Sequence, residues 1–326
     1  MNRGGVLTGA LRIAVRSPTT WPLALATFLL RGGIVVLALP ILVLPTPAGL
    51  ADVFAPTLTA LAFGSISQEV YVVGGVATLG LVVWLMVGGW VAAVLEAEGA
   101  RMVWLDEEVH APRPRPLARS HVAGRILIAR LAALLPLAIA LALGSVRIVL
   151  VTYRELTNPV DVSTPLVTRV LRESPEVVAA VLVTWVVGEI VGGIAARRIV
   201  LAGDGVGAAL RFAIATGIRH AGSTLARFGL PAIALLVVLL STTVATGSAW
   251  SAVGGVLVSG SDPLAAVAIV ALLVVVWLVG LLLTGLVCAW RGAIWTVAEI
   301  AREGTFGGSA DRRPGDWQTE GTSATL

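Results

Sequence analysis

The stretch EVVAAVLVTWVVGEIVGGIAAR, residues 176–197, decides the fold class. Between its terminal charges every residue is apolar or small except Thr184 and Glu189, and Glu189 is the only charged one. An α-helix of about 20 such residues spans the roughly 30 Å hydrocarbon core of a bilayer. The stretch shows no alternation of polar and apolar residues, which a membrane barrel strand would require. It therefore predicts a transmembrane helix.

Five further stretches have the same character, and together they predict six spans. The approximate spans are 22–45, 71–95, 130–151, 176–197, 228–248 and 264–290. The composition agrees, because 57% of the 326 residues are hydrophobic and only 13% are charged, whereas soluble domains carry about 25% charged residues. We predict an all-α fold, a polytopic transmembrane helical bundle. Residues 1–305 are expected to form a single transmembrane domain and 306–326 a disordered cytoplasmic tail.

The distribution of arginine predicts the orientation in the membrane. All 23 basic residues are arginines, and they concentrate in the N-terminal segment, after the even-numbered spans and in the C-terminal end, whereas loops 46–70 and 249–263 contain none. Basic residues gather on the cytoplasmic side of membrane proteins, so both termini are expected in the cytoplasm at a bacterial inner membrane. The arginines follow the membrane borders and do not form one patch, so no nucleic-acid partner is expected.

Sequence similarities within the chain predict three hairpin repeats. ALRIAV at 10–15 returns as ALRFAI at 209–214, and LARSHV at 117–122 is a weaker copy. Each copy precedes an odd-numbered span, and each odd span carries a border arginine followed by a proline: Arg31 and Pro40, Arg130 and Pro136, Arg227 and Pro231. We predict three pseudo-repeated hairpins, each with an amphipathic lead-in helix. Chance similarity in Ala-, Leu- and Arg-rich sequence is the alternative.

Glu189 is the main candidate for a functional residue. It lies eight residues before Arg197, about 12 Å deeper in the membrane, where a charge costs on the order of 2.5–3.5 kcal/mol on insertion scales. We therefore expect a partner, and the border arginines Arg31, Arg130 and Arg227 are the candidates. Two interpretations stay open. The carboxylate joins helices through an ion pair or hydrogen bond, or it lines a polar cavity that binds a cation, a proton or another ligand.

Small residues on the fourth span predict close helix packing. Gly188, Gly192 and Ala196 recur every four residues, and such a face allows another helix to approach closely. The prolines of the odd spans are expected to kink or loosen their helices, because proline removes a backbone donor. Glu96, at the cytoplasmic end of the second span, is expected at the membrane interface.

Chemical motifs are scarce. The sequence contains no HExxH, GxSxG or Walker-type motif, and its histidines are scattered over predicted connections without a metal-ligand spacing. A single cysteine, Cys288, cannot form a disulfide within one chain. We expect no catalytic residue, no metal site and no cofactor, and the chain is not expected to be an enzyme.

The segment IAARRIVLAGDGVGAALRFAI, residues 194–214, carries a resemblance to known proteins. With its ALR-type lead-in, it is similar to bacterial six-helix integral membrane proteins of unknown function, which include the membrane domain found on some glycerophosphodiester phosphodiesterases. The resemblance covers mainly residues 175–300. It implies a membrane module and no activity, since these residues contain no soluble block of the length of the phosphodiesterase catalytic domain.

Two functions stay open from the sequence. A non-catalytic integral membrane module, acting as an accessory, assembly or lipid-contacting subunit, is favoured by the weak polarity of the spans, the packing glycines and the short loops. The alternative is a transporter or permease subunit with a polar cavity framed by Glu189 and the border arginines. The expected partners are the lipid bilayer and either another membrane subunit or further copies of this chain.

Overall fold

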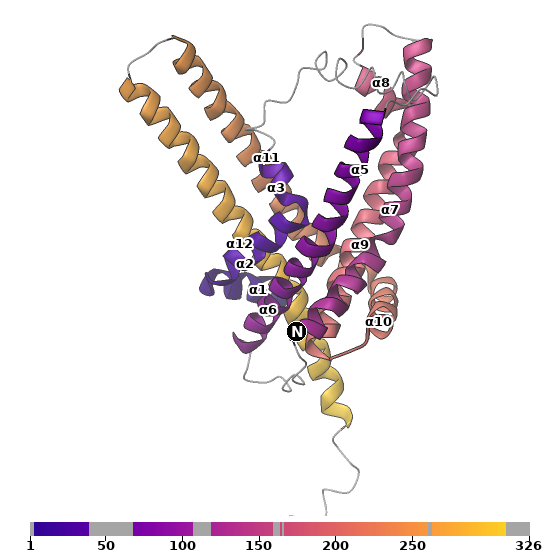
Figure 1. The fold of residues 1–326 in the computed structure, drawn as a ribbon. Helices are drawn as coiled ribbons and strands as arrows, with labels where there is room; N and C mark the ends of the chain where they lie inside the picture. Colours follow the sequence, from indigo (N-terminus) through magenta and orange to yellow (C-terminus); the bar gives the residue numbers. More distant parts are fainter. Residues whose placement is uncertain are drawn as a thin grey trace, which may run out of the picture. The chain divides into compact units, whose positions relative to one another are not determined.

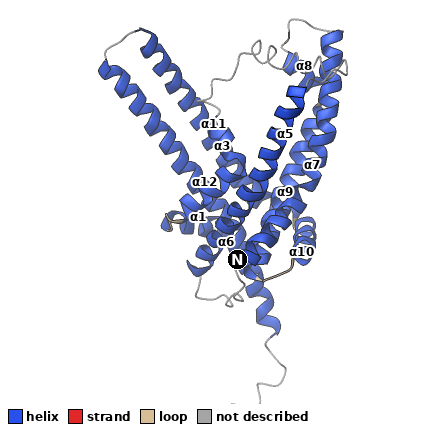
Figure 2. Cartoon of the chain, in the orientation of Figure 1, coloured by secondary structure: helices blue, strands red, loops and turns tan. Residues whose placement is uncertain are grey.

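The protein is helical throughout the part of the chain that the structure describes. The computed structural model describes residues 3–38, 68–106, 119–158, 164, 166–259 and 263–310. Within these residues 95% are helical and no strand occurs, as Figure 2 shows. The all-α prediction is confirmed.

The helical elements follow one another with short turns wherever the connections are described (Figure 1). Two of them, η1 and η2, are π-helical and lie within the first and second spans. In chain order the elements are α1 (Arg3–Arg16), α2 (Thr20–Phe28), η1 (Leu29–Gly33), α3 (Ile34–Ala38), α5 (Gln68–Val83), η2 (Trp84–Gly88), α6 (Gly89–Asp106), α7 (Arg119–Thr157), α8 (Leu166–Glu173), α9 (Pro175–Leu201), α10 (Val206–Arg219), α11 (Ala221–Ser259) and α12 (Pro263–Ala310).

Among the residues that the structure describes, six stretches are long and apolar enough to cross a membrane, as predicted. They are Thr20–Leu37, Tyr71–Leu105, His121–Thr157, Pro175–Leu201, Ala221–Val253 and Val267–Arg302. Several run past the predicted limits: α7 has 39 residues, a length of about 58 Å, nearly twice the hydrocarbon thickness.

The predicted end of the first span and the predicted start of the C-terminal tail lie close to the ends of described segments. The predicted first span extends beyond Ala38, so its end and Pro40 lie outside the described residues. At the other terminus α12 continues to Ala310, so the first five residues of the predicted tail are helical. Residues 311–326 lie outside the described residues.

Two of the three predicted lead-in segments are separate helices, α1 before α2 and α10 before α11. Pro18 separates α1 from α2, because proline lacks an amide hydrogen and restricts the residue before it. Gly203, between α9 and α10, has φ +73°, a conformation that favours glycine. In the second of the three predicted repeats, residues 119–122 are instead the first turn of α7, which continues unbroken into the span.

The first span is kinked at a glycine. Within η1, Arg31 has φ −87° and ψ 16°, and Gly32 has φ +99° and ψ −3°. A positive φ is strained for residues with a Cβ, so glycine is the residue that permits this break. By contrast, α7 and α11 continue as helices through Pro136 and Pro231, so the predicted proline kinks do not interrupt them.

The chain divides into two compact units. Unit 1 comprises Met1–Thr8, Ala100–Phe228 and Ile294–Leu326, and unit 2 comprises Gly9–Gly99 and Gly229–Ala293. The prediction of one transmembrane domain over residues 1–305 stays a prediction.

Unit 1 is organised around α7 and α9, which lie side by side, with α10 packed on α9 (Figure 1). Its core consists mainly of alanine and isoleucine side chains, each no more than 2% exposed: Ala123, Ile126, Ala129, Ile194, Ala195, Ile199, Ala209, Ala213 and Ile294. Small side chains allow helix backbones to approach closely, which is how helices associate in a membrane.

In unit 2, glycines mark the close contacts. A Cβ added at Gly285 of α12 would lie 3.1 Å from the Trp21 carbonyl oxygen of α2, and one added at Gly88 of η2 would lie 3.6 Å from the Leu30 carbonyl oxygen of η1. The two π-helical segments therefore contact each other through a residue without a side chain.

Candidate functional site

Arg130 of α7 and Glu189 of α9 form an ion pair in unit 1. Arg130 Nη1 lies 3.8 Å from Glu189 Oε2, and the two side chains are 11% and 14% exposed. This separation is too long for a hydrogen bond, so the contact is one of charge. The structure thus brings Glu189 together with one of its candidate partners.

Glycines on α9 make room for this contact. A Cβ added at Gly192 would lie 2.9 Å from Arg130 Cδ, and one added at Gly188 would lie 2.9 Å from the Ala133 carbonyl oxygen. Ala196, the third member of the small-residue face, is completely buried. The predicted small-residue face of α9 therefore packs against α7 at Gly188 and Gly192, and the Arg130 side chain lies across Gly192.

A second ion pair joins the same two helices, α7 and α9. Arg147 Nε donates a hydrogen bond of 3.2 Å to Glu176 Oε1. Arg130 lies against Gly192, and Arg147 contacts Glu176. Arg147 comes 17 residues after Arg130 on α7, whereas Glu176 comes 16 residues before Gly192 on α9, as expected for antiparallel helices. Seventeen residues correspond to about 25 Å of helix. Arg130 and Arg147 therefore lie roughly that far apart along α7.

Arg31 pairs with Glu96 in unit 2. Arg31 Nη2 donates a hydrogen bond to Glu96 Oε2, and the two side chains are 26% and 5% exposed. Arg31 lies at the kink of the first span, so the pair joins the break to α6. Glu96 is buried against this arginine, and its expected place at the membrane interface stays a prediction.

A cluster of charged side chains around Arg198 and Glu299 in unit 1 was not predicted. Arg198 of α9 donates hydrogen bonds to Asp204 Oδ2 at 2.9 Å and to Glu299 Oε1 of α12 at 3.3 Å. Arg302 donates to Glu299 Oε2 at 3.1 Å, and the Arg198 guanidinium carbon lies 4.4 Å from the centre of the Phe212 ring. Glu299 is 2% exposed. The one available signal was the spacing of Glu299 and Arg302, which places them on one helix face.

Arg227, the remaining candidate, lies at the start of α11 next to Phe228. The Phe228 ring meets the Trp185 ring edge-on, with centroids 6.0 Å apart. Trp185 is four residues before Glu189, one turn along α9. The start of α11 therefore contacts α9 through this ring pair, one helical turn from Glu189.

The arrangement has a clear chemical consequence. An incoming cation has to compete with the arginine for a carboxylate that a guanidinium already contacts. Among the residues that the structure describes, no group of three or more His, Cys, Asp and Glu could hold a metal ion. The charged groups join helices within each unit.

Fold and site together define a polytopic helical membrane protein whose buried carboxylates are paired with arginines. Comparisons with protein-family models, curated proteins and solved structures return no match to this chain.

Proposed function

We propose that this protein is a non-catalytic integral membrane module, an accessory, assembly or lipid-contacting subunit that acts through the contacts of its apolar surface. We place it in the bacterial plasma membrane with both termini in the cytoplasm, which the distribution of arginine supports. Its partners are the bilayer and a second membrane polypeptide or further copies of the chain.

The observation that carries this proposal is the internal pairing of the carboxylates. Glu96, Glu189 and Glu299 have side chains that are 5%, 14% and 2% exposed, and each lies against an arginine of another helix in its own unit. A buried charge pair is costly to break, because one charge is then left without compensation. Carboxylates used in this way hold helices together, as interhelical polar contacts do in membrane bundles.

The outer faces of the helices add support. Leu143 of α7, Val183 of α9 and Leu236 of α11 are 68%, 59% and 64% exposed, and many further apolar side chains are exposed along the same spans. Apolar surface of this extent is stable against lipid tails or against another apolar protein surface. A membrane module with such a surface acts through its contacts with lipid or with another membrane polypeptide.

Native mass spectrometry of the protein, released gently from its own membrane, tests the proposal. We expect a second polypeptide at fixed stoichiometry, a defined oligomer, or a particular retained lipid. A bare monomer without any of these, combined with transport activity that Glu189→Gln abolishes, would overturn it.

One observation favours the alternative, a transporter or permease subunit. The break at Arg31 and Gly32 lies beside the Arg31–Glu96 pair, and discontinuous helices form ion and substrate sites in transporters because they expose backbone groups. The neighbouring η2 is π-helical, a feature that often accompanies functional sites.

Proton flux into proteoliposomes tests this alternative. The protein is reconstituted with an internal pH-sensitive dye, and flux is driven by a valinomycin-dependent potassium gradient. A transporter would show flux above that of empty liposomes and a loss of flux in Glu96→Gln, with Gly74→Ala as the matched control, because a Cβ at Gly74 meets no atom within 4 Å. Flux equal to that of empty liposomes contradicts proton transport.

A further inference from the structure

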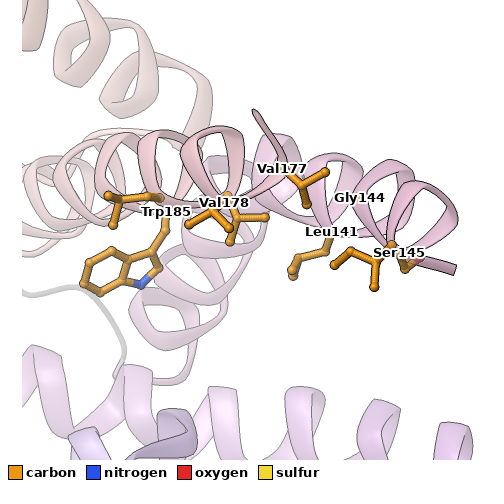
Figure 3. A pocket seen from close by; sticks show the side chains of 9 residues that line it. Leu141, Gly144, Ser145, Val177, Val178 and Trp185 are labelled. Atoms are coloured by element: carbon orange, nitrogen blue, oxygen red, sulfur yellow. The ribbon is translucent and has the colours of Figure 1, made fainter. Parts of the chain in front are cut away.

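A groove lies between α7 and α9, in the half of the helix pair next to Arg147 and Glu176. Its volume is about 470 Å³, within the range of ligand pockets. Figure 3 shows the side chains that line it, among them Leu141 of α7 and Val178 and Trp185 of α9. Every lining residue belongs to unit 1.

Two small residues of α7 line the groove. Gly144 has no side chain, and a Cβ there would lie 2.6 Å from Val177 Cγ1. Ser145 follows it, and its hydroxyl donates a hydrogen bond of 2.8 Å to the Ala142 carbonyl oxygen. The one hydroxyl in the lining is therefore bonded back to its own helix, and the remaining surface offers apolar contacts.

The length of the groove along α9 is close to the hydrocarbon thickness of one leaflet. From Glu176 to Trp185 α9 rises by nine residues, or about 13 Å, against roughly 15 Å for half of the hydrocarbon layer. The side chains of Leu141, Val178 and Leu182 are 51%, 48% and 55% exposed. A groove with these dimensions and this lining is complementary to a lipid acyl chain.

Two residues of opposite charge, Arg147 and Glu176, adjoin lining residues in the sequence, and we call this pair the rim of the groove. Glu176 precedes the lining residue Val177, and Arg147 precedes the lining residue Ile148. Their side chains are 53% exposed for Arg147 and 58% for Glu176. The guanidinium has five N–H donors, and the hydrogen bond to Glu176 uses Nε. The rim therefore offers donors for a phosphate beside a carboxylate that attracts an ammonium group.

We propose that this groove binds one zwitterionic phospholipid of the bilayer, with an acyl chain along Leu141, Val178 and Leu182. The phosphate lies at Arg147, and a protonated amine, as in phosphatidylethanolamine, lies at Glu176. The proposal rests on the proposed lipid-contacting function and names the lipid class. The paired rim charges favour a zwitterionic headgroup, because Glu176 repels a purely anionic one.

Photo-crosslinking of the full chain in nanodiscs tests the proposal. The nanodiscs contain phosphatidylglycerol with a trace of phosphatidylethanolamine that carries a diazirine in one acyl chain, and labelled peptides are mapped by mass spectrometry. We expect labelling concentrated in residues 141–148 and 178–185. Unlabelled phosphatidylethanolamine should compete better than additional phosphatidylglycerol.

Two variants, each with a matched control, locate the site. Val178→Trp fills the groove and should lower labelling roughly tenfold, as expected when an apolar site is blocked. Val183→Trp, on the same helix and outside the lining, should leave labelling within about twofold. Arg147→Gln should reduce the preference for phosphatidylethanolamine roughly tenfold, whereas Arg154→Gln, about 10 Å further along α7, should not. Equal elution from a sizing column shows that each variant is folded.

Labelling spread evenly over lipid-facing residues, or unchanged in Val178→Trp, would overturn the proposal. Crosslinks between two copies through this groove would do the same, because a second chain would then occupy it. The proposed function fails separately: a lipid retained in native mass spectrometry but insensitive to Val178→Trp excludes only the groove, whereas a bare transporting monomer excludes the lipid-contacting module.

Discussion

Gly188 of α9 packs so closely on Ala133 of α7 that a Cβ on Gly188 would lie 2.9 Å from the Ala133 carbonyl oxygen. Backbone atoms cannot move aside as the end of a flexible side chain can. The approach of the two central helices of unit 1 therefore depends on the missing side chain at this position.

Alanine substitutions along α9 should follow this geometry. Gly188→Ala should destabilise the protein by about 1–3 kcal/mol, the usual cost of overpacking. Gly192→Ala should cost less, because the atom it meets is the side-chain carbon Arg130 Cδ. Gly193→Ala is the control, since its Cβ would meet Trp295 at 3.7 Å, and alanine favours helix by up to about 1 kcal/mol. Thermal unfolding in detergent measures the stabilities of the three variants. Equal midpoints for Gly188→Ala and Gly193→Ala would contradict the expected ranking.

The Arg130–Glu189 pair should appear as coupling in a double-mutant cycle. Glu189→Ala leaves a buried guanidinium without its partner carboxylate and should lower stability, and Arg130→Ala should do the same for the carboxylate. The double variant should cost less than the sum of the single variants by about 0.5–3 kcal/mol. Strict additivity of the three unfolding free energies would show that the pair contributes no interaction of its own.

Glu299 should matter far more for stability than Glu176. Glu299 is 2% exposed and accepts hydrogen bonds from Arg198 and Arg302, so Glu299→Ala should cost about 3–5 kcal/mol. Glu176→Ala removes an exposed pair with Arg147 and should leave the unfolding midpoint nearly unchanged. Chemical denaturation in detergent compares them. Similar midpoints would mean that burial does not set the strength of these pairs.

The kink in the first span should depend on Gly32. Its φ of +99° is strained for any L residue, so Gly32→Ala should destabilise unit 2 by about 1–2 kcal/mol. Gly75→Ala is the control, because a Cβ there meets nothing within 4 Å and its backbone φ is not positive. Limited proteolysis of the two variants reports the local effect. Equal protection would indicate that the span can straighten at Gly32 without loss.

Glu189 could be predicted from the sequence because a charge in an apolar run needs a partner in the folded chain. Gly188 and Gly192 could be predicted because their spacing puts them on one helix face. The partner of Glu96 could not be predicted, because Arg31 lies 65 residues away. The orientation of Arg31 also depends on a backbone break that two consecutive glycines in a sequence do not predict. The contact between Arg198 and Glu299 could not be predicted either, because the two residues are 101 positions apart in the sequence.

By itself the sequence determined the all-α class and the six spans, because hydrogen bonding of the backbone in an apolar medium leaves a long apolar segment little choice other than a helix. Only the tertiary structure decided which charges meet, where the first span breaks and where the groove between α7 and α9 opens. These features depend on the register and closest approach of helices, which are set by contacts between residues far apart in the chain and not by the composition of any one helix.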